Sequence, residues 1–218
     1  MDLKKIKGAI FDMDGTIIDS MQYWDQLDER FLTRRGFEYT EEVSQFLRTC
    51  SLAMSAEYFS KNYGIPGSIE DIIKMINDEM REPYEKDVTV KEGAVEFLEA
   101  LREKGVPMCI ATSTDRELVE LVLNRLDLMK YFGKIFTCSE IGKNKDHPDI
   151  FEEALSYLGT EREDTPVFED SLYAMKTAKK AGYPVVAVAD KSAEWSREEI
   201  QKIADIYVEK PGDLKTIF

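Results

Sequence analysis

The feature that most constrains the fold of this chain is a regular alternation between short apolar runs and amphipathic helical patterns. The runs cover residues 8–13, 106–112, 134–138, 165–169, 184–189 and, at one edge, 205–208. Most of them are apolar throughout rather than alternately apolar and polar, which is typical of strands that are covered on both faces. Strands that alternate with helices in this way predict an α/β fold with a doubly wound parallel sheet.

The ends of the expected helices are marked by capping residues as well as by apolar periodicity. Gly105, Gly159 and Gly182 follow three of the helical patterns, at the position where helices commonly end. Two further helices are expected to begin at capping boxes, in which a hydroxyl and an acid three residues later satisfy free backbone N–H groups. These boxes are Thr114 with Glu117 and Ser196 with Glu199.

The alternation is interrupted between the first and second runs by a long stretch that is expected to be mostly helical. Apolar, methionine and aromatic residues recur at helical spacing over residues 41–62, including Phe46 and Met54, and again over 68–82. We expect these stripes to form the core of a small helical domain. A crossover between parallel strands needs only one helix, so this domain is an insertion. The expected boundaries are 18–86 for the helical domain and 1–17 with 87–218 for the α/β domain.

The charge and the apolar runs limit the possible partners. The 218 residues include 29 Lys and Arg against 43 Asp and Glu, a formal net charge of −14. Because an acidic surface repels nucleic acid and anionic lipid, neither is an expected partner. The longest apolar run, Val185–Ala189, is far shorter than the about 20 residues of a membrane span. No apolar signal segment builds up before Asp12, so we expect a cytoplasmic protein.

Chemically active side chains gather where the expected strands end. Asp12, Asp14 and Gly15 lie at the end of the first strand, Thr112 and Ser113 end the second, Lys145 lies after the third, and Glu169 and Asp170 end the fourth. Ligands of open parallel sheets bind beyond the carboxyl ends of the strands, which lie at one edge. We therefore expect these acids, hydroxyls and the lysine to form one site.

The acids in this set favour a magnesium ion. Asp12 and Asp14 are two residues apart in extended chain, so both carboxylates are expected to face the same site. Together with Asp170 they offer the hard oxygen ligands that Mg²⁺ prefers. Three carboxylates around one point would repel one another without a cation.

The remaining residues favour a phosphate group beside that ion. Gly15 allows backbone N–H groups to approach an anion closely. The hydroxyl of Thr112 or Ser113 can donate a hydrogen bond to a phosphoryl oxygen, and Lys145 can neutralise its charge. The sequence therefore indicates phosphoryl chemistry.

Four segments resemble the motifs of the haloacid dehalogenase-like hydrolases, in the expected order and spacing. They are FDMDGTIIDS, IATST, the lysine that opens KDHPDIF, and FEDSLYAMKTAKKAGYPVVAV. The resemblance covers residues 8–16 and about 90–190, and it is closest to the subgroup with a helical cap, which includes the β-phosphoglucomutase-like enzymes. It implies a Rossmann-like α/β core with an inserted α-helical cap over the strand ends.

The resemblance also implies a role for each site residue. Asp12 matches the nucleophile that forms an aspartyl phosphate, and Asp14 matches the general acid and base. Lys145 matches the lysine that positions Asp12 and the phosphate. Thr112, with Ser113 beside it, matches the hydroxyl that holds the phosphoryl group. The implied Mg²⁺ ligands are Asp12, the main-chain oxygen of Asp14 and Asp170, with Glu169 as a supporting acid.

The implied function is a Mg²⁺-dependent phosphatase that acts on a small phosphorylated metabolite, with the helical insertion as a lid that reads the leaving group. The sequence does not indicate which metabolite, so sugar phosphates, nucleotides and phosphoglycolate all remain open. A monomer is the default expectation.

A phosphomutase of the β-phosphoglucomutase type is the main alternative, because it would use the same core. This chain has Trp24 where that pattern places a cap histidine. The arginine-containing cap loop of the mutase is also not evident, since Arg48 aligns poorly with it. We therefore favour the phosphatase.

Two other classes remain as alternatives. A dehalogenase also uses an aspartate at the first strand, but it has no need of Asp14. A non-catalytic phosphate-binding or regulatory protein, such as a response-regulator receiver, carries its acceptor aspartate after the third strand, where this chain has Cys138 and Ser139. A relative of the hydrolases without activity would be expected to have lost Asp12 or Asp14, and both are present.

Overall fold

A computed structural model of the chain describes residues 3–47, 50 and 52–217. The chain divides into two compact units. One comprises Met1–Met21 and Val88–Phe218, and we call it the α/β unit; the other is Gln22–Asp87, and we call it the helical unit.

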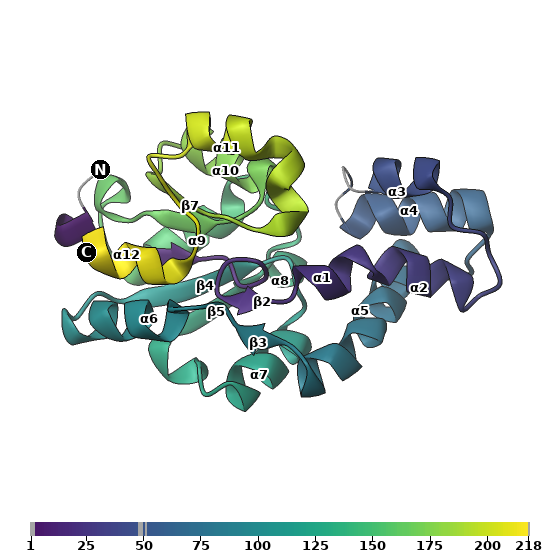
Figure 1. Cartoon of the computed structure of the whole chain (residues 1–218), viewed down its shortest axis with the longest axis horizontal. Coiled ribbons are helices and arrows are strands. Elements are labelled where there is room, and N and C mark those ends of the chain that lie inside the picture. The colour runs from purple at the N-terminus through teal and green to yellow at the C-terminus, as the bar shows by residue number, and fades with distance from the viewer. Residues whose placement is uncertain (1–2, 48–49, 51, 218) are drawn as a thin grey trace. The chain divides into compact units, whose positions relative to one another are not determined.

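The α/β unit is built on a six-stranded parallel sheet (Figure 1). Its strands are β1 (Ala9–Phe11), β4 (Met108–Thr112), β5 (Lys134–Thr137), β6 (Val167–Glu169), β7 (Val185–Val188) and β8 (Ile206–Val208). The order across the sheet is β5-β4-β1-β6-β7-β8, and every neighbouring pair is parallel. The chain thus places β4 and β5 on one side of β1, and then β6, β7 and β8 on the other side. Every expected run contains a strand, and the predicted doubly wound sheet is confirmed.

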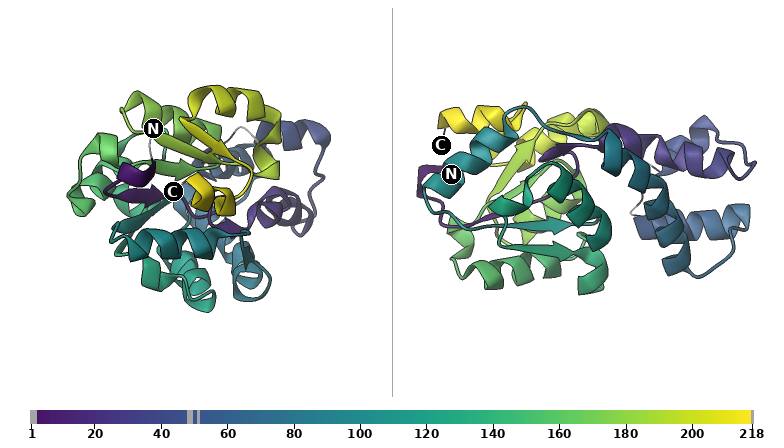
Figure 2. Two further views of the ribbon diagram at one scale, coloured as in Figure 1. Left: turned by 60° about the vertical axis from the view of Figure 1, so that its left-hand side comes forward. Right: turned by 90° about the horizontal axis from the view of Figure 1, so that it is seen from below.

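Helices cover both faces of this sheet (Figures 1 and 2). They are α6 (Ala94–Glu103), α7 (Arg116–Arg125), α8 (Cys138–Ile141), α9 (Asp149–Leu158), α10 (Leu172–Lys180), α11 (Arg197–Ile203) and α12 (Pro211–Ile217). Short 3-10 turns lie at Leu3–Lys5, Met129–Tyr131, Arg162–Asp164 and Lys191–Ser196.

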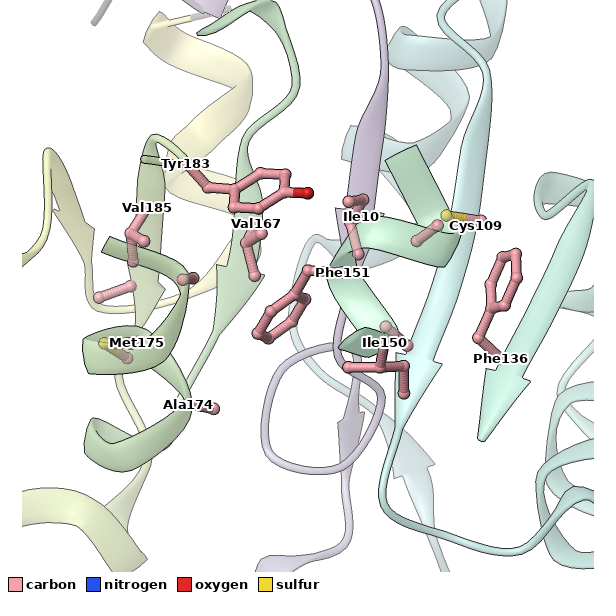
Figure 3. Packing of buried hydrophobic residues seen from close by; sticks show 14 of the residues in the cluster. Ile10, Cys109, Phe136, Ile150, Phe151, Val167, Ala174, Met175, Tyr183 and Val185 are labelled. Atoms are coloured by element: carbon pink, nitrogen blue, oxygen red, sulfur yellow. The ribbon is translucent and has the colours of Figure 1, made fainter. Parts of the chain in front are cut away.

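The core follows from the two-residue period of the strands, which sends neighbouring side chains to opposite faces. Ile10 of β1 packs with Val167 of β6 and with Phe151 of α9, as Figure 3 shows. The next residue, Phe11, points to the other face and stacks on Phe168 with ring centroids 4.3 Å apart. Both faces of β1 are therefore apolar, which explains why its sequence does not alternate.

A two-stranded antiparallel ribbon links the helical unit to the sheet. Its strands are β2 (Ile18–Asp19) and β3 (Thr89–Val90), with Ile18 opposite Val90. The sequence analysis expected no strands here, because two residues are too few to show a period.

The helical unit contains most of α1 (Met21–Asp25), together with α2 (Leu27–Thr33), α3 (Glu41–Leu47), α4 (Leu52–Tyr63) and α5 (Ile69–Lys86). Its core holds Phe31 stacked on Phe59 at 5.1 Å, with Ile72 and Met80 of α5 also fully buried. The prediction that Phe46 and Met54 belong to this core is wrong. Both are about half exposed, and Phe46 instead contacts Tyr58 at 4.7 Å near the surface.

Three further local predictions are corrected by the structure. Cys138 begins α8 instead of ending β5. Neither expected capping box forms: Asp115 precedes α7, and the Ser196 hydroxyl donates to the carbonyl of Ala193. The hydroxyl of Thr114 instead donates to Asp14 in the site described below.

No helix within the described ranges is both long and apolar enough to cross a membrane.

Candidate active site

The site is centred on β1, where the order of the strands reverses. Asp12 follows β1 directly, and its N–H donates to the carbonyl of Phe168 at 2.9 Å. Phe11 is paired with Ile110 of β4 on one side and with Phe168 of β6 on the other. Asp12 therefore lies between the ends of these two strands. This crevice is where open α/β sheets bind their ligands.

Three buried acids meet at this point. Carboxylate oxygens of Asp12, Glu169 and Asp170 lie within 4.8 Å of one another. Burial, reinforced by the neighbouring acids Glu169 and Asp14, raises the pKa of Asp12 to about 8. Burial and the charges of Glu169 and Asp12 also raise the pKa of Asp170 well above its ordinary value. Both carboxylates thus need a nearby positive charge to remain ionised at neutral pH.

Lys145 supplies part of that charge from the loop between α8 and α9. Its side chain is only 2% exposed, and its ammonium pairs with Asp12 and with Glu169, the latter at 2.6 Å. Although burial opposes the charged form, the two carboxylates raise the pKa of Lys145 well above its ordinary value. Lys145 therefore holds Asp12 in place and carries a fixed positive charge beside it.

Glu169 is occupied on both oxygens by protein donors. Oε1 accepts from Lys145, while Oε2 accepts from the N–H groups of Asp170 and Ser171 at 2.9 and 3.0 Å and from the Ser171 hydroxyl at 3.0 Å. Burial disfavours its charge, but Lys145 and these hydrogen bonds lower the pKa of Glu169 below its ordinary value. Glu169 is suited to orient Lys145 and Asp170 rather than to bind a ligand itself.

The carboxylate of Asp14 is not one of the three clustered acids, and hydroxyl groups hold it. Ser20 donates to Oδ1 at 2.6 Å, and Thr114 donates to Oδ2 at 2.8 Å. Each oxygen of its carboxylate therefore accepts a hydrogen bond from a hydroxyl group.

Gly15 closes the loop after β1. Its φ of 76° lies in the left-handed region, and its N–H donates to the carbonyl of Ile18 at 3.0 Å. A Cβ atom at this position would collide with the carboxylate of Asp170 and with the side chain of Met21. Only glycine fits both the backbone conformation and the space.

The two hydroxyl candidates at the end of β4 differ in exposure. Thr112 is buried, and its Oγ1 accepts from the N–H of Thr114 at 3.1 Å. Ser113 is exposed, and its hydroxyl lies 3.6 Å from the sulfur of Cys138. The structure thus places both at the same edge of the sheet as Asp12.

Three residues near the site were missed by the sequence analysis. Ser20 and Thr114 contact Asp14 because the chain folds back, and no local pattern indicates these contacts, since Thr114 has only the pattern of a helix cap. Tyr173, in the first turn of α10, is 44% exposed, and its phenol interacts with Ser113 and Lys145. Its position three residues after Asp170 was the available signal, since the first turn of a helix that begins at a strand end faces the site.

The donor set fits a divalent cation. The nearest acids, Asp12, Glu169 and Asp170, carry up to three negative charges against the single ammonium of Lys145. All their donor atoms are hard oxygens, which suit Mg²⁺. A cation would also lower the raised pKa values of Asp12 and Asp170.

Comparison with known proteins agrees with this arrangement. The chain matches the family of haloacid dehalogenase-like hydrolases over residues 9–188. It is 29% identical over 178 residues to the phosphorylated carbohydrates phosphatase of Thermotoga maritima, covering 81% of this chain and 82% of that protein. It is 28% identical over 178 residues to validoxylamine A 7'-phosphate phosphatase of Streptomyces hygroscopicus, with the same shares of 81% and 82%.

A solved structure shares the fold over almost the whole chain. CbbY from Rhodobacter sphaeroides, in complex with phosphate, matches with a TM-score of 0.82 at 21% identity over 96% of both chains. Fold, site and sequence match therefore agree: the chain belongs to the haloacid dehalogenase-like hydrolases. Within that class it is a phosphoric monoester hydrolase, a phosphatase.

Proposed function

We propose that the protein is a Mg²⁺-dependent phosphatase that hydrolyses a small phosphorylated metabolite through an aspartyl phosphate on Asp12. The observation that carries this proposal is the buried group of Asp12, Glu169 and Asp170, with Lys145 paired to Asp12, where the strand order reverses. The phosphatases named above act on compounds of this kind, which supports the substrate class.

In the first step a carboxylate oxygen of Asp12 attacks phosphorus, and the bond from phosphorus to the leaving oxygen breaks. Asp14 donates a proton to that oxygen, so the product leaves as an alcohol. Lys145, the Thr112 hydroxyl and N–H groups of the Gly15 loop stabilise the charge on the phosphoryl oxygens.

In the second step Asp14 accepts a proton from water as the water oxygen attacks phosphorus. The bond to Asp12 breaks, which restores its carboxylate and releases inorganic phosphate. Asp12, Asp170 and the main-chain oxygen of Asp14 would hold Mg²⁺, with Glu169 in support. When bound, the ion supplies positive charge to the phosphoryl oxygens.

We further propose that the helical insertion acts as a cap that contacts the leaving group and selects among substrates. It enters and leaves through β2 and β3, immediately after the proposed catalytic loop. An insertion at this point of the sequence is suited to exclude water and to select the substrate.

The structure of the helical unit supports the phosphatase over the mutase. The Trp24 indole N–H donates to the Tyr84 hydroxyl at 3.0 Å, and Tyr84 is fully buried. Trp24 is therefore part of the packing of this unit, and an indole cannot relay protons as a histidine can. Arg48, the other residue considered for the mutase, lies outside the described residues.

The first test is hydrolysis of p-nitrophenyl phosphate. We expect turnover with Mg²⁺ and its loss with EDTA or in Asp12→Asn. A folded protein that neither binds Mg²⁺ nor turns over a panel of phosphorylated metabolites would refute the proposal. The second test supplies β-glucose 1-phosphate with the 1,6-bisphosphate. Glucose 6-phosphate formed without free phosphate would establish the mutase instead.

A further inference from the structure

A second lysine, Lys91, lies near the site and makes its hydrogen bonds to groups other than the three acids described above. The side chain of Lys91 is 12% exposed. Its ammonium donates to the carbonyl of Gly15, to the carbonyl of Ala189 at 2.9 Å and to Oδ2 of Asp190 at 2.7 Å. These three acceptors match the three N–H bonds of an ammonium, so the group is fully satisfied.

Lys91 connects three segments of the chain through hydrogen bonds. It follows β3 directly, and its own N–H donates to the carbonyl of Ile17 at 2.9 Å. Gly15 belongs to the loop after β1, and Ala189 follows β7. One side chain therefore joins the ribbon, the proposed catalytic loop and the end of a strand two places away in the sheet.

Through Gly15, Lys91 is connected to Asp170 of the acidic cluster. Gly15 packs so closely against the carboxylate of Asp170 that even a Cβ atom would collide with it. Lys91 donates to the carbonyl of the same glycine. A shift of the Gly15 loop would therefore move Asp14, the preceding residue, and change the space in which the Asp170 carboxylate lies.

Asp190 completes the arrangement. Its Oδ1 accepts from the N–H and the hydroxyl of Ser192 at 3.0 and 2.8 Å, and its side chain is 6% exposed. Its charge is balanced by Lys91, and both charges also act on Asp170, whose pKa is raised by Asp190 and lowered by Lys91.

We propose that Lys91 is a positioning residue that fixes the Gly15 loop against Asp170 and so maintains the geometry in which the site binds its divalent cation. This inference rests on the proposed Mg²⁺ site. Lys91 acts through Gly15 and touches neither substrate nor ion.

The test measures Mg²⁺ binding to the metal-free protein by calorimetry. Lys91→Met combined with Asp190→Asn removes both charges together, so no buried charge is left without a partner. The matched control is Lys210→Met, which removes an exposed lysine paired with Glu92, the neighbour of Lys91. We expect the dissociation constant to rise at least 10-fold in the double variant and to stay within 2-fold in the control.

Thermal unfolding without metal separates positioning from general damage. The inference requires a double variant that unfolds cooperatively yet binds Mg²⁺ weakly. If the double variant does not fold, Lys91→Gln takes its place, since its amide has only two N–H donors and cannot hold all three acceptors together. Wild-type Mg²⁺ affinity in either folded variant would overturn the inference and leave the proposed function intact. Absence of Mg²⁺ binding in the wild-type protein would overturn both.

Discussion

The hydroxyl of Thr114 donates to Oδ2 of Asp14 over 2.8 Å, between two residues that lie 100 positions apart in the chain. This bond links the loop after β1 to the start of α7. The opposite carboxylate oxygen accepts from Ser20, so Asp14 is held on both sides. The residue that is proposed to transfer protons thus accepts a hydroxyl hydrogen bond on each carboxylate oxygen.

Replacement of Thr114 by valine removes this bond while it keeps the shape of the side chain. We expect kcat on p-nitrophenyl phosphate to fall by about 10–100-fold, because general acid–base catalysis depends on the position of the acid. Mg²⁺ affinity is expected to change little, since Asp14 does not contribute its side chain to the acidic cluster. Thr33→Val, at an exposed position of α2, is the control. Unchanged kcat in Thr114→Val would contradict this role.

Asp170→Asn is expected to have opposite effects with and without metal. Its raised pKa means that the ionised side chain is unfavourable in the metal-free site, so the variant should be at least as stable as the wild type there. Saturating Mg²⁺ is expected to raise the Tm of the wild type by on the order of 5 °C, because ligands stabilise the state that binds them. The variant should lose this shift. A full Mg²⁺ shift in Asp170→Asn would exclude it as a ligand.

The stability of the chain should depend on Asp28 near pH 6. Burial, with repulsion from Asp25, raises the pKa of Asp28 from 3.8 to about 6. The folded state then binds more protons than the unfolded state between about pH 4 and 6, so this carboxyl lowers stability as the pH rises through that window. We expect Asp28→Asn to gain about 1–2 kcal/mol at pH 7.5 and little at pH 4. Urea unfolding at both pH values measures this, and an equal gain at both would contradict it.

Thr16→Val should be neutral or stabilising, by up to about 1 kcal/mol. The Thr16 hydroxyl is buried and has no hydrogen-bond partner among the described residues. It lines a small cavity with apolar neighbours that include Phe11 and Phe97. Valine keeps the shape and removes the unsatisfied group. Thermal unfolding checks this, and a loss above about 1 kcal/mol would mean that the hydroxyl has a partner such as bound water.

The sheet and the acids at its edge could be predicted because both depend on local sequence. An apolar run such as Val185–Ala189 indicates a strand buried on both faces, and Asp12 and Asp170 directly follow such runs. The partners of Asp14 could not be predicted in this way. Thr114 has the local pattern of a helix cap, yet its hydroxyl is directed to a loop distant in sequence, so a tertiary contact overrides the local preference.

The same reasoning explains the errors in the helical unit. Apolar spacing predicts that a residue lies on the apolar stripe of a helix, but not whether another element covers that stripe. Phe46 lies on the short helix α3, whose buried residues are Val43 and Leu47. Nothing in the sequence distinguishes Phe46 from Val43 and Leu47, although only Val43 and Leu47 are buried.

The ribbon of β2 and β3 has a consequence for how such a chain can change over time. Ile18 and Val90 are direct partners, so the segment between them departs and returns at points only about 5 Å apart. A tight turn of two residues can bridge that gap. Helices, a larger domain or a short hairpin could therefore be inserted between β2 and β3. None of these insertions would require a change in the connections between the strands of the six-stranded sheet.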